Sequence, residues 1–413
     1  MSKDNIIVGI DVGSSNIRAV IAQDLPDLEF PRVIGVGVVP SFGIRKGVIV
    51  DPEEVNKIID EAVEKSERMA GTTVREANVS IGGIEIGFQN SKGIIAVGRA
   101  DGEVTEDDLV RALEEAQVVS LPLNKEIIHV VPKNYRLDDQ ENIKNPLGMK
   151  GVRMEVNALI IEGSSAHVKN IGKCINHSGI EINSLILEPL AAAKSVLNKK
   201  QKELGVVLVN MGGGTTSLAV FEEGDLLHTA VLPIGSGHVT NDIAIGLRTT
   251  VDVAEKIKLE YGCAISKEVN KKEEIDLSQV DSSESGFVSR FHVTEIIEAR
   301  LEEIFNLVNK ELKAIGKSGL LPAGIVLTGG GAKVPQISEL AKSVIGLPAQ
   351  VGFPVNLGGM MDKVDDPSFA TVIGLILWEK EARQNSSGIT QTVAKTTGDT
   401  VKKIKKWVEK FLP

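Results

Sequence analysis

Glycines and hydroxyl residues gather in two short segments of this chain, each flanked by runs of β-branched and aliphatic residues. The first segment contains Asp11, Gly13, Ser14, Ser15 and Asn16, and the second contains Asn210, Gly212, Gly213, Gly214 and Thr215. Glycines let a backbone turn sharply and approach a ligand closely, and the N–H groups and hydroxyls of such a turn suit a phosphate group. An ordinary β-hairpin turn has the same composition, so either segment alone decides little.

A third glycine segment follows the apolar run 325–327. It consists of Thr328, Gly329, Gly330, Gly331 and Ala332, and a helix is expected from Pro335. A strand, a glycine turn and a helix in this order let the backbone lie against a flat base or sugar. Two phosphate-type hairpins followed by such a unit favour a nucleotide site over a coincidence of turns.

The segments between these turns alternate strand-like and helix-like patterns. Strands are expected at 33–39 and 48–50. A helix is expected over 52–69, because Pro52 suits a first turn and apolar residues recur on one face. Further helices are expected at about 105–118, 237–247, 251–261, 293–315 and 367–381, and the polar segment 267–285 is expected to be a loop with short strands.

Several further segments resemble one protein family. They are 46–51, 145–149 with 151–153, 187–193, 240–247, 254–258 and the basic C-terminus. With the three glycine turns, they make the chain similar, over nearly its whole length, to the FtsA family of the actin-like ATPase superfamily. The resemblance implies an α/β, actin-like two-domain fold with duplicated ribonuclease-H-like halves, an FtsA-type inserted subdomain and a C-terminal amphipathic helix.

The resemblance also implies domain boundaries. The core of the first actin-like domain is expected at 1–82, 163–198 and 355–383, with the inserted subdomain at 83–162. The core of the second domain is expected at 199–240 and 291–354, with an outer subdomain at 241–290. The segment 384–399 is rich in Ser, Thr and Gly and is expected to be a flexible linker before a membrane-targeting helix at 400–413.

The same resemblance assigns roles in binding ATP and Mg²⁺. Asp11 would hold Mg²⁺ through water, because this ion gives up its hydration shell reluctantly. One side of the phosphates would meet Gly13, Ser14, Ser15 and Asn16, and the other side Gly212, Gly213, Gly214 and Thr215. Glu255 and Lys258 share a helix face and alone would suggest a surface ion pair. The resemblance gives them ribose and base contacts, with Gly329, Gly330, Gly331 and Ala332 opposite.

Hydrolysis is a separate question, because two positions depart from catalytically active relatives. Asn210 stands where those relatives have an aspartate, and Ser217 stands where a second aspartate is usual. An amide can hydrogen-bond water but carries no charge and cannot take a proton. Glu188 matches the position that orients the lytic water. These residues predict ATP binding with slow or absent turnover.

The distribution of charge and the small number of cysteines argue against several kinds of partner and site. The chain has 46 basic and 56 acidic residues in 413, with the basic excess confined to the C-terminus. An acidic body argues against nucleic acid as a partner. The two cysteines are too few for a disulfide framework, and Cys174 with His177 makes at most half of a metal site. Neither a signal peptide nor a transmembrane segment is expected.

The C-terminal segment has the pattern of an amphipathic helix. One face would carry Val401, Ile404, Trp407, Val408, Phe411 and Leu412, and Lys402, Lys403, Lys406 and Lys410 would surround it. The linker, the aromatic residues and the lysines favour a helix lying at an anionic membrane surface. The alternative is a last helix docked on the body of the protein.

Together these expectations describe a cell division protein at the cytoplasmic face of the membrane. By resemblance it would bind ATP, polymerise with itself, and tether FtsZ filaments, with other division proteins as further partners. Arg300 matches the family's basic residue at the contact with the FtsZ C-terminal tail, although it could also be an exposed salt bridge. The alternatives are a PilM-like pilus-assembly protein, an MreB-like protein, and an actin-like enzyme or chaperone.

Overall fold

The computed structural model describes residues 5–25, 27–119 and 121–387. The predicted membrane helix at 400–413, with all its apolar and lysine residues, therefore lies outside the described residues, as does most of the predicted linker. The chain divides into two compact units. The first contains the described residues of Met1–Ile84 and Cys174–Leu375, and the second contains the described residues of Glu85–Lys173 and Ile376–Pro413.

Two sheets form the framework of the first unit. The first sheet has the strand order β11-β6-β1-β2-β3-β19. Strands β1, β2 and β3 pair antiparallel, whereas β6 runs parallel to β1 and β11 runs parallel to β6. The bounds are Ile6–Val12 (β1), Asn16–Gln23 (β2), Arg32–Pro40 (β3), Glu76–Ile81 (β6), Glu181–Leu187 (β11) and Gly358–Gly359 (β19).

The second sheet repeats this topology. Its order is β14-β13-β12-β17-β18, with β12, β13 and β14 antiparallel and with β17 and β18 parallel to β12. The bounds are Val206–Met211 (β12), Thr216–Glu222 (β13), Asp225–Leu232 (β14), Ile325–Thr328 (β17) and Ala349–Val351 (β18). Three antiparallel strands followed by two parallel strands occur twice, so the unit consists of duplicated halves, as predicted.

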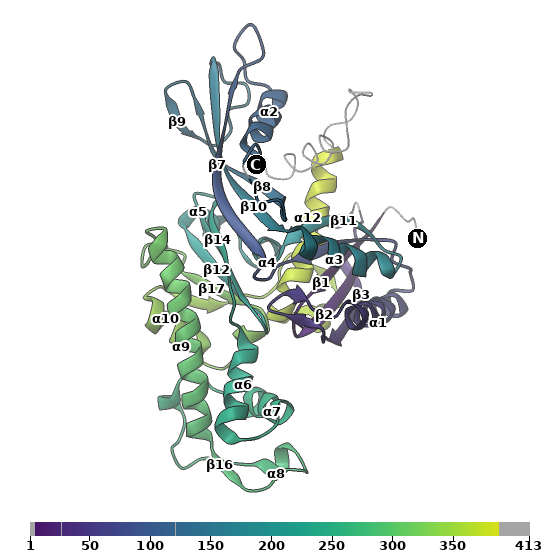
Figure 1. The fold of residues 1–413 in the computed structure, drawn as a ribbon, viewed down its shortest axis with the longest axis vertical. Coiled ribbons are helices and arrows are strands. Elements are labelled where there is room, and N and C mark those ends of the chain that lie inside the picture. The colour runs from purple at the N-terminus through teal and green to yellow at the C-terminus, as the bar shows by residue number, and fades with distance from the viewer. Residues whose placement is uncertain (1–4, 26, 120, 388–413) are drawn as a thin grey trace. The chain divides into compact units, whose positions relative to one another are not determined.

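Helices connect and cover these strands. Those of the first half are α1 (Pro52–Ala70), α4 (Glu188–Val196) and α5 (Lys199–Leu204), and the end of α3 (Ser165–His177) from Cys174 also belongs to this unit. The second half adds α6 (Ser236–Leu247), α7 (Val251–Tyr261), α8 (Leu277–Val280), α9 (Arg290–Ala314) and α10 (Ile337–Ile345). After these come α11 (Met361–Val364) and α12 (Ala370–Ser387). Figure 1 shows α6 and α7 beside the long helix α9, with α8 and β16 near the same end of α9.

Short elements complete the first unit. They are the pairs β4 (Ile44–Arg45) with β5 (Val48–Ile49) and β15 (Glu274–Asp276) with β16 (Phe287–Ser289), and the 3-10 turns Ser266–Glu268, Gly330–Lys333 and Pro367–Phe369. The predicted polar loop at 267–285 thus contains a short strand and one turn of helix.

Helix α1 illustrates how the sequence sets local structure. The Asp51 carboxylate accepts a hydrogen bond from the Glu54 N–H, and Gly71 ends the helix in the left-handed conformation. The predicted apolar face is buried against β3, where Gly37 is required, because a Cβ there would lie 1.9 Å from the Ala62 carbonyl oxygen. Burial of this face fixes α1 on the first sheet.

Helix α9 forms much of the core of the second half. Ile297, Leu301, Ile304, Phe305 and Val308 are fully buried, and Ile296 is partly buried against them. The helix begins at Arg290 rather than near 293, because the Ser289 hydroxyl accepts a hydrogen bond from the His292 N–H and caps the first turn.

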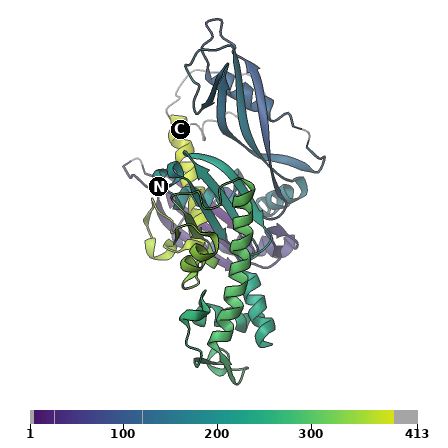
Figure 2. The ribbon, with the colours of Figure 1, turned by 90° about the vertical axis from the view of Figure 1, so that its left-hand side faces the viewer.

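The second unit contains a four-stranded antiparallel sheet of order β7-β10-β8-β9. Helix α2 (Glu106–Ala116) packs on one face of it, as Figure 1 and Figure 2 show, and buries Leu109 and Leu113 against Tyr135 and Met154. The strands are Ile86–Ala96 (β7), Lys125–Leu137 (β8), Gln140–Ile143 (β9) and Arg153–Ser164 (β10). This unit therefore has its own hydrophobic core.

Candidate nucleotide site

One cavity of about 370 Å³ in the first unit brings the three glycine turns together. The turn after β1 and the turn after β12 line it, with the glycine turn after β17 and residues of α4, α6 and α7. Of the predicted site residues, the lining includes Asp11, Gly13, Ser14, Ser15, Asn16, Glu188, Asn210, Gly212, Gly213, Gly214, Thr215, Glu255, Lys258, Gly329, Gly330 and Gly331. A volume of this size is typical of small-molecule pockets.

The two predicted phosphate turns face each other across very short distances. A Cβ on Gly213 would lie 1.8 Å from the Ser15 hydroxyl oxygen, and a Cβ on Gly214 would lie 2.9 Å from that of Ser14. A Cβ at either position would therefore force the facing serine hydroxyl to move. The Ser14 hydroxyl also accepts a hydrogen bond from the Gly47 N–H at 3.0 Å, which ties the first turn to the hairpin of β4 and β5.

The N-terminal end of helix α6 contacts the second turn. Its Ser236 N–H donates to the Gly212 carbonyl at 2.8 Å, and its Gly237 N–H donates to the Gly213 carbonyl at 2.9 Å. These bonds use two N–H groups at the helix start to fix the backbone of the turn. The turn is thereby held in a defined shape before any ligand arrives.

Two acidic side chains share this cavity. The Ser80 hydroxyl donates to Asp11 Oδ1 at 2.8 Å, and the Arg18 guanidinium lies 4.0 Å from Asp11 Oδ2. Burial nevertheless raises the pKa of Asp11. Burial, together with the nearby Asp11 charge, raises the pKa of Glu188 to about 8. Removing the carboxylates from water disfavours their charged form.

This donor set fits a bound Mg²⁺ ion. Asp11 would offer carboxylate oxygens to the hydrated ion, which prefers oxygen ligands, and a cation beside Asp11 and Glu188 would favour their charged forms. Within the described residues, no group of three or more His, Cys, Asp and Glu side chains could hold a metal. Protein side chains would therefore contribute only part of the coordination, with water and phosphate oxygens supplying the rest.

Asn210 donates hydrogen bonds to two neighbouring side chains, one of which is Glu188. Its Nδ2 donates to Glu188 Oε1 at 2.7 Å and to Thr371 Oγ1 at 3.3 Å. An amide in this place orients Glu188 but accepts no proton. The Ser217 hydroxyl, at the other departure from active relatives, is buried and has no hydrogen-bond partner among the described residues.

Glu255, Lys258 and Thr240 form a compact polar group on the α6 and α7 side of the cavity. Lys258 Nζ donates to Glu255 Oε2 at 2.6 Å and to Thr240 Oγ1 at 2.8 Å. The Lys258 side chain is only 7% exposed, whereas that of Glu255 is 43% exposed. The ion pair that the spacing suggested is thus present, and both of its members line the cavity.

Ala332 does not line the cavity, in contrast to the glycines before it. The turn after β17 forms the 3-10 helix Gly330–Lys333, which directs Ala332 into the core of the second half. A direct contact between the Ala332 side chain and a ligand is therefore not supported. Lys333, Val334 and Pro335 line the cavity beyond it.

Several other residues that line the cavity were not predicted from the sequence. They are Arg18, Gly47, Ser80, Gly82, Ser236, Leu259, Ser368 and Thr371. Arg18 could have been found, because antiparallel pairing across the first turn places it directly opposite Asp11. Its guanidinium lies 5.4 Å from the centre of the Phe369 ring, and burial lowers its pKa. Ser80 and Thr371 come from distant segments and carry no local signal.

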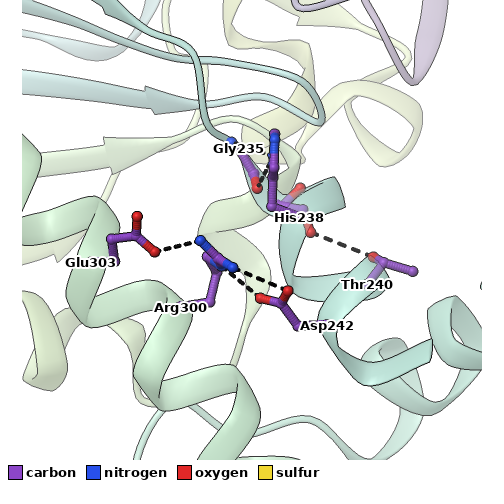
Figure 3. Close-up of polar contacts among 7 residues, drawn as sticks. Gly235, His238, Thr240, Asp242, Arg300 and Glu303 are labelled. Carbon is purple, nitrogen blue, oxygen red and sulfur yellow. Dashed lines mark hydrogen bonds and ion pairs between the residues drawn. The ribbon is translucent and has the colours of Figure 1, made fainter. Parts of the chain in front are cut away.

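Arg300 lies on α9, away from the glycine turns. Figure 3 shows its guanidinium between the carboxylates of Asp242 and Glu303. Its Nε donates to Asp242 Oδ2 at 2.6 Å and one NH2 group donates to Oδ1 at 3.1 Å, while the other pairs with Glu303. Arg300 also lines a surface hollow with the apolar side chains Ile245 and Ile296. Arg300 thus forms a salt bridge, which was the alternative to a partner contact, and its partner role stays a prediction.

The duplicated halves and their shared cavity define an actin-like protein, and solved structures have the same fold. The PilM–PilN type IV pilus biogenesis complex matches with a TM-score of 0.65 at 16% identity, covering 90% of this chain and 97% of that one. MreB 5 of Spiroplasma citri bound to AMPPNP matches with a TM-score of 0.55 at 15% identity, covering 94% and 100%. At these identities the likeness concerns the fold alone.

The sequence comparisons are more specific. A family model described as "Cell division protein FtsA" matches residues 207–374, and one described as "SHS2 domain inserted in FTSA" matches residues 83–162. Cell division protein FtsA of Pseudomonas aeruginosa is 38% identical over 98% of this chain and 97% of its own length. That of Bacillus subtilis is 38% identical over 91% and 84%. The chain belongs to the FtsA family of cell division proteins.

These findings confirm the predicted family, the actin-like fold and the inserted subdomain. They favour the FtsA family over the PilM-like and MreB-like alternatives, which match at much lower identity. No helix among the described residues is both long and apolar enough to cross a membrane. The ligand roles of the cavity residues and the domain boundaries stay predictions.

Proposed function

We propose that the cavity binds ATP with Mg²⁺. The observation that carries this proposal is the meeting of two glycine turns and two acidic side chains in one cavity of the first unit. Turn N–H groups and the Ser14, Ser15 and Thr215 hydroxyls would meet the phosphates from both sides. A solved MreB 5 with this fold is bound to AMPPNP, which supports the binding of a nucleotide by a protein of this fold.

In this proposal the residues on each wall of the cavity contact a different part of the ligand. Asp11 would hold Mg²⁺ through water, and the ion would neutralise phosphate charge when bound. Glu255 and Lys258 would contact the ribose and base, with Gly329, Gly330 and Gly331 opposite. Arg18 adds a buried positive charge beside the first turn, which favours an anionic ligand.

We further propose that ATP turnover is slow or absent. Glu188 is the side chain that could orient a lytic water, but Asn210 already occupies Glu188 Oε1 with a hydrogen bond. The Asn210 amide carries no charge and accepts no proton, so it cannot take the place of the aspartate that helps to activate water. Binding would then serve assembly rather than repeated hydrolysis.

Membership of the FtsA family supports the rest of the proposal. The protein would polymerise, attach to an anionic membrane surface through 400–413, and bind the C-terminal tail of FtsZ beside Arg300. A single short amphipathic helix binds only moderately, and a filament would present many at once. We also propose the domain boundaries that the Sequence analysis gives for the two actin-like domains and the inserted subdomain.

Reconstitution on anionic vesicles tests the proposal as a whole. The full chain, fluorescent FtsZ and vesicles would be mixed with and without ATP and Mg²⁺, and FtsZ on the vesicles would be measured. The proposal predicts FtsZ recruitment that requires this protein and increases with ATP. Equal recruitment by a chain lacking 401–413 would contradict the tether.

A further inference from the structure

Thr240 is a buried hydroxyl residue on α6 that lies behind the cavity wall. Its side chain is 3% exposed and does not line the cavity, whereas Glu255 and Lys258 on α7 do. Thr240 Oγ1 lies 2.5 Å from Glu255 Oε2 and 2.8 Å from Lys258 Nζ. Figure 3 shows Thr240 on the same helix as His238 and Asp242. Thr240 thus contacts both polar residues that we place at the sugar.

The three side chains satisfy one another in a single arrangement. A threonine hydroxyl has one hydrogen to donate and two lone pairs with which to accept. The hydroxyl has two acceptors within reach, Glu255 Oε2 at 2.5 Å and the Ser236 carbonyl oxygen at 3.4 Å, and the much shorter contact assigns the hydrogen to Glu255. A lone pair of the hydroxyl then accepts from the Lys258 ammonium. Lys258 also donates directly to Glu255 Oε2, so this carboxylate oxygen receives two hydrogen bonds.

The other carboxylate oxygen, Glu255 Oε1, is available to a ligand, because Glu255 lines the cavity. No hydrogen bond joins it to any residue that the structure describes, and the Glu255 side chain remains 43% exposed. A carboxylate oxygen accepts hydrogen bonds and does not donate them. A group with free hydroxyls, such as the 2′ and 3′ positions of a ribose, is therefore a suitable partner.

We propose that Thr240 is a positioning residue that fixes the rotamer of Glu255 and thereby makes the site select a ribose over a deoxyribose. The proposal rests on the proposed nucleotide function of the same cavity. Threonine suits this task because its branched side chain has few rotamers, and its hydroxyl spans the two α7 residues. Because Glu255 is already fixed, less side-chain conformational entropy is lost when the sugar binds.

The test compares ATP with 2′-deoxy-ATP and 3′-deoxy-ATP, each with Mg²⁺, in calorimetric titrations of the full chain. The unaltered protein should bind ATP at least about tenfold more tightly than one of the deoxy analogues, because a missing hydroxyl leaves a charged acceptor unpaired. Thr240→Val, which keeps the shape, should lose most of this selectivity by weakening ATP and leaving the analogues nearly unchanged. Thr240→Ser should restore it.

A purely structural role gives a different pattern. Thr240→Val would then weaken all three nucleotides equally, together with a lower melting temperature, and this result would overturn the proposal. Equal binding of ATP and both analogues by the unaltered protein would also overturn it, even if Thr240→Val fails to fold, while leaving the proposed nucleotide function intact. Failure of the unaltered protein to bind any of the three would instead refute the proposed function itself.

Discussion

Replacing Glu188 by glutamine should stabilise the ligand-free protein, and the gain should grow as pH rises. Burial and Asp11 raise the pKa of Glu188 from 4.5 to about 8. Between these values the folded chain keeps a proton on Glu188 that the unfolded chain releases, so the free energy of unfolding falls as pH increases. Glutamine mimics the protonated carboxyl, and its Oε1 can still accept the hydrogen bond from Asn210.

The size of the effect follows from the separation of the two pKa values. Each pH unit inside the window corresponds to about 1.4 kcal/mol. The gain from Glu188→Gln should therefore be about 1 kcal/mol at pH 5 and roughly 3 kcal/mol at pH 7, and it should level off near roughly 5 kcal/mol above pH 8. These values apply when the substitution removes the carboxylate charge of Glu188 completely.

Urea unfolding at pH 5, 6, 7 and 8, without nucleotide or Mg²⁺, would measure this gain. The transition of the first unit must be followed separately, because a chain of two units need not unfold in one step. Glu339→Gln is a matched control, since Glu339 is an exposed carboxylate of the same unit. A gain for Glu188→Gln that stays constant across pH would refute the assigned burial of this carboxylate.

Three further predictions concern turnover, partner and membrane. Phosphate release by the unaltered protein should be very slow, and Asn210→Asp should raise it while Glu188 is present; brisk release that Glu188→Ala abolishes would show that the amide suffices. Arg300→Ala should weaken binding of an FtsZ tail peptide by about tenfold, whereas Arg290→Ala on the same helix should not; equal losses would argue against a contact at Arg300. Trp407→Glu should release the protein from anionic vesicles in flotation assays without lowering its melting temperature, and the reverse result would favour a tail docked on the body.

The glycine turns could be predicted from sequence because their chemistry is local. Gly213 and Gly214 are followed within the same short segment by the hydroxyl residue Thr215, so composition reveals the turn. The meeting of two such turns in one cavity came only from the resemblance, since residues so far apart share no local pattern. The structure supplies the physical reason, which is the repeated strand order of the two halves.

The site residues and helix boundaries that were not predicted from the sequence depend on tertiary contacts or on the capping of helix ends. Thr371 and Ser80 enter the site from distant elements, and nothing near them in sequence marks them as site residues. Ala332 follows three cavity glycines, yet a single 3-10 turn directs it into the core. The final helix was expected at 367–381, but it begins at Ala370, because the Asp366 carboxylate caps a short 3-10 turn before it, and it continues to Ser387.

The most direct test of the central claim is a titration of MgATP into the unaltered protein and Gly213→Val. A Cβ at Gly213 would lie 1.8 Å from the Ser15 hydroxyl oxygen, so valine must fill the space between the two turns. Gly358→Val is the control, because a Cβ at Gly358 meets no atom within 4 Å. We predict MgATP binding by the unaltered and control proteins and none by Gly213→Val. Undiminished binding by a folded Gly213→Val protein would contradict the assignment of this cavity to a nucleotide.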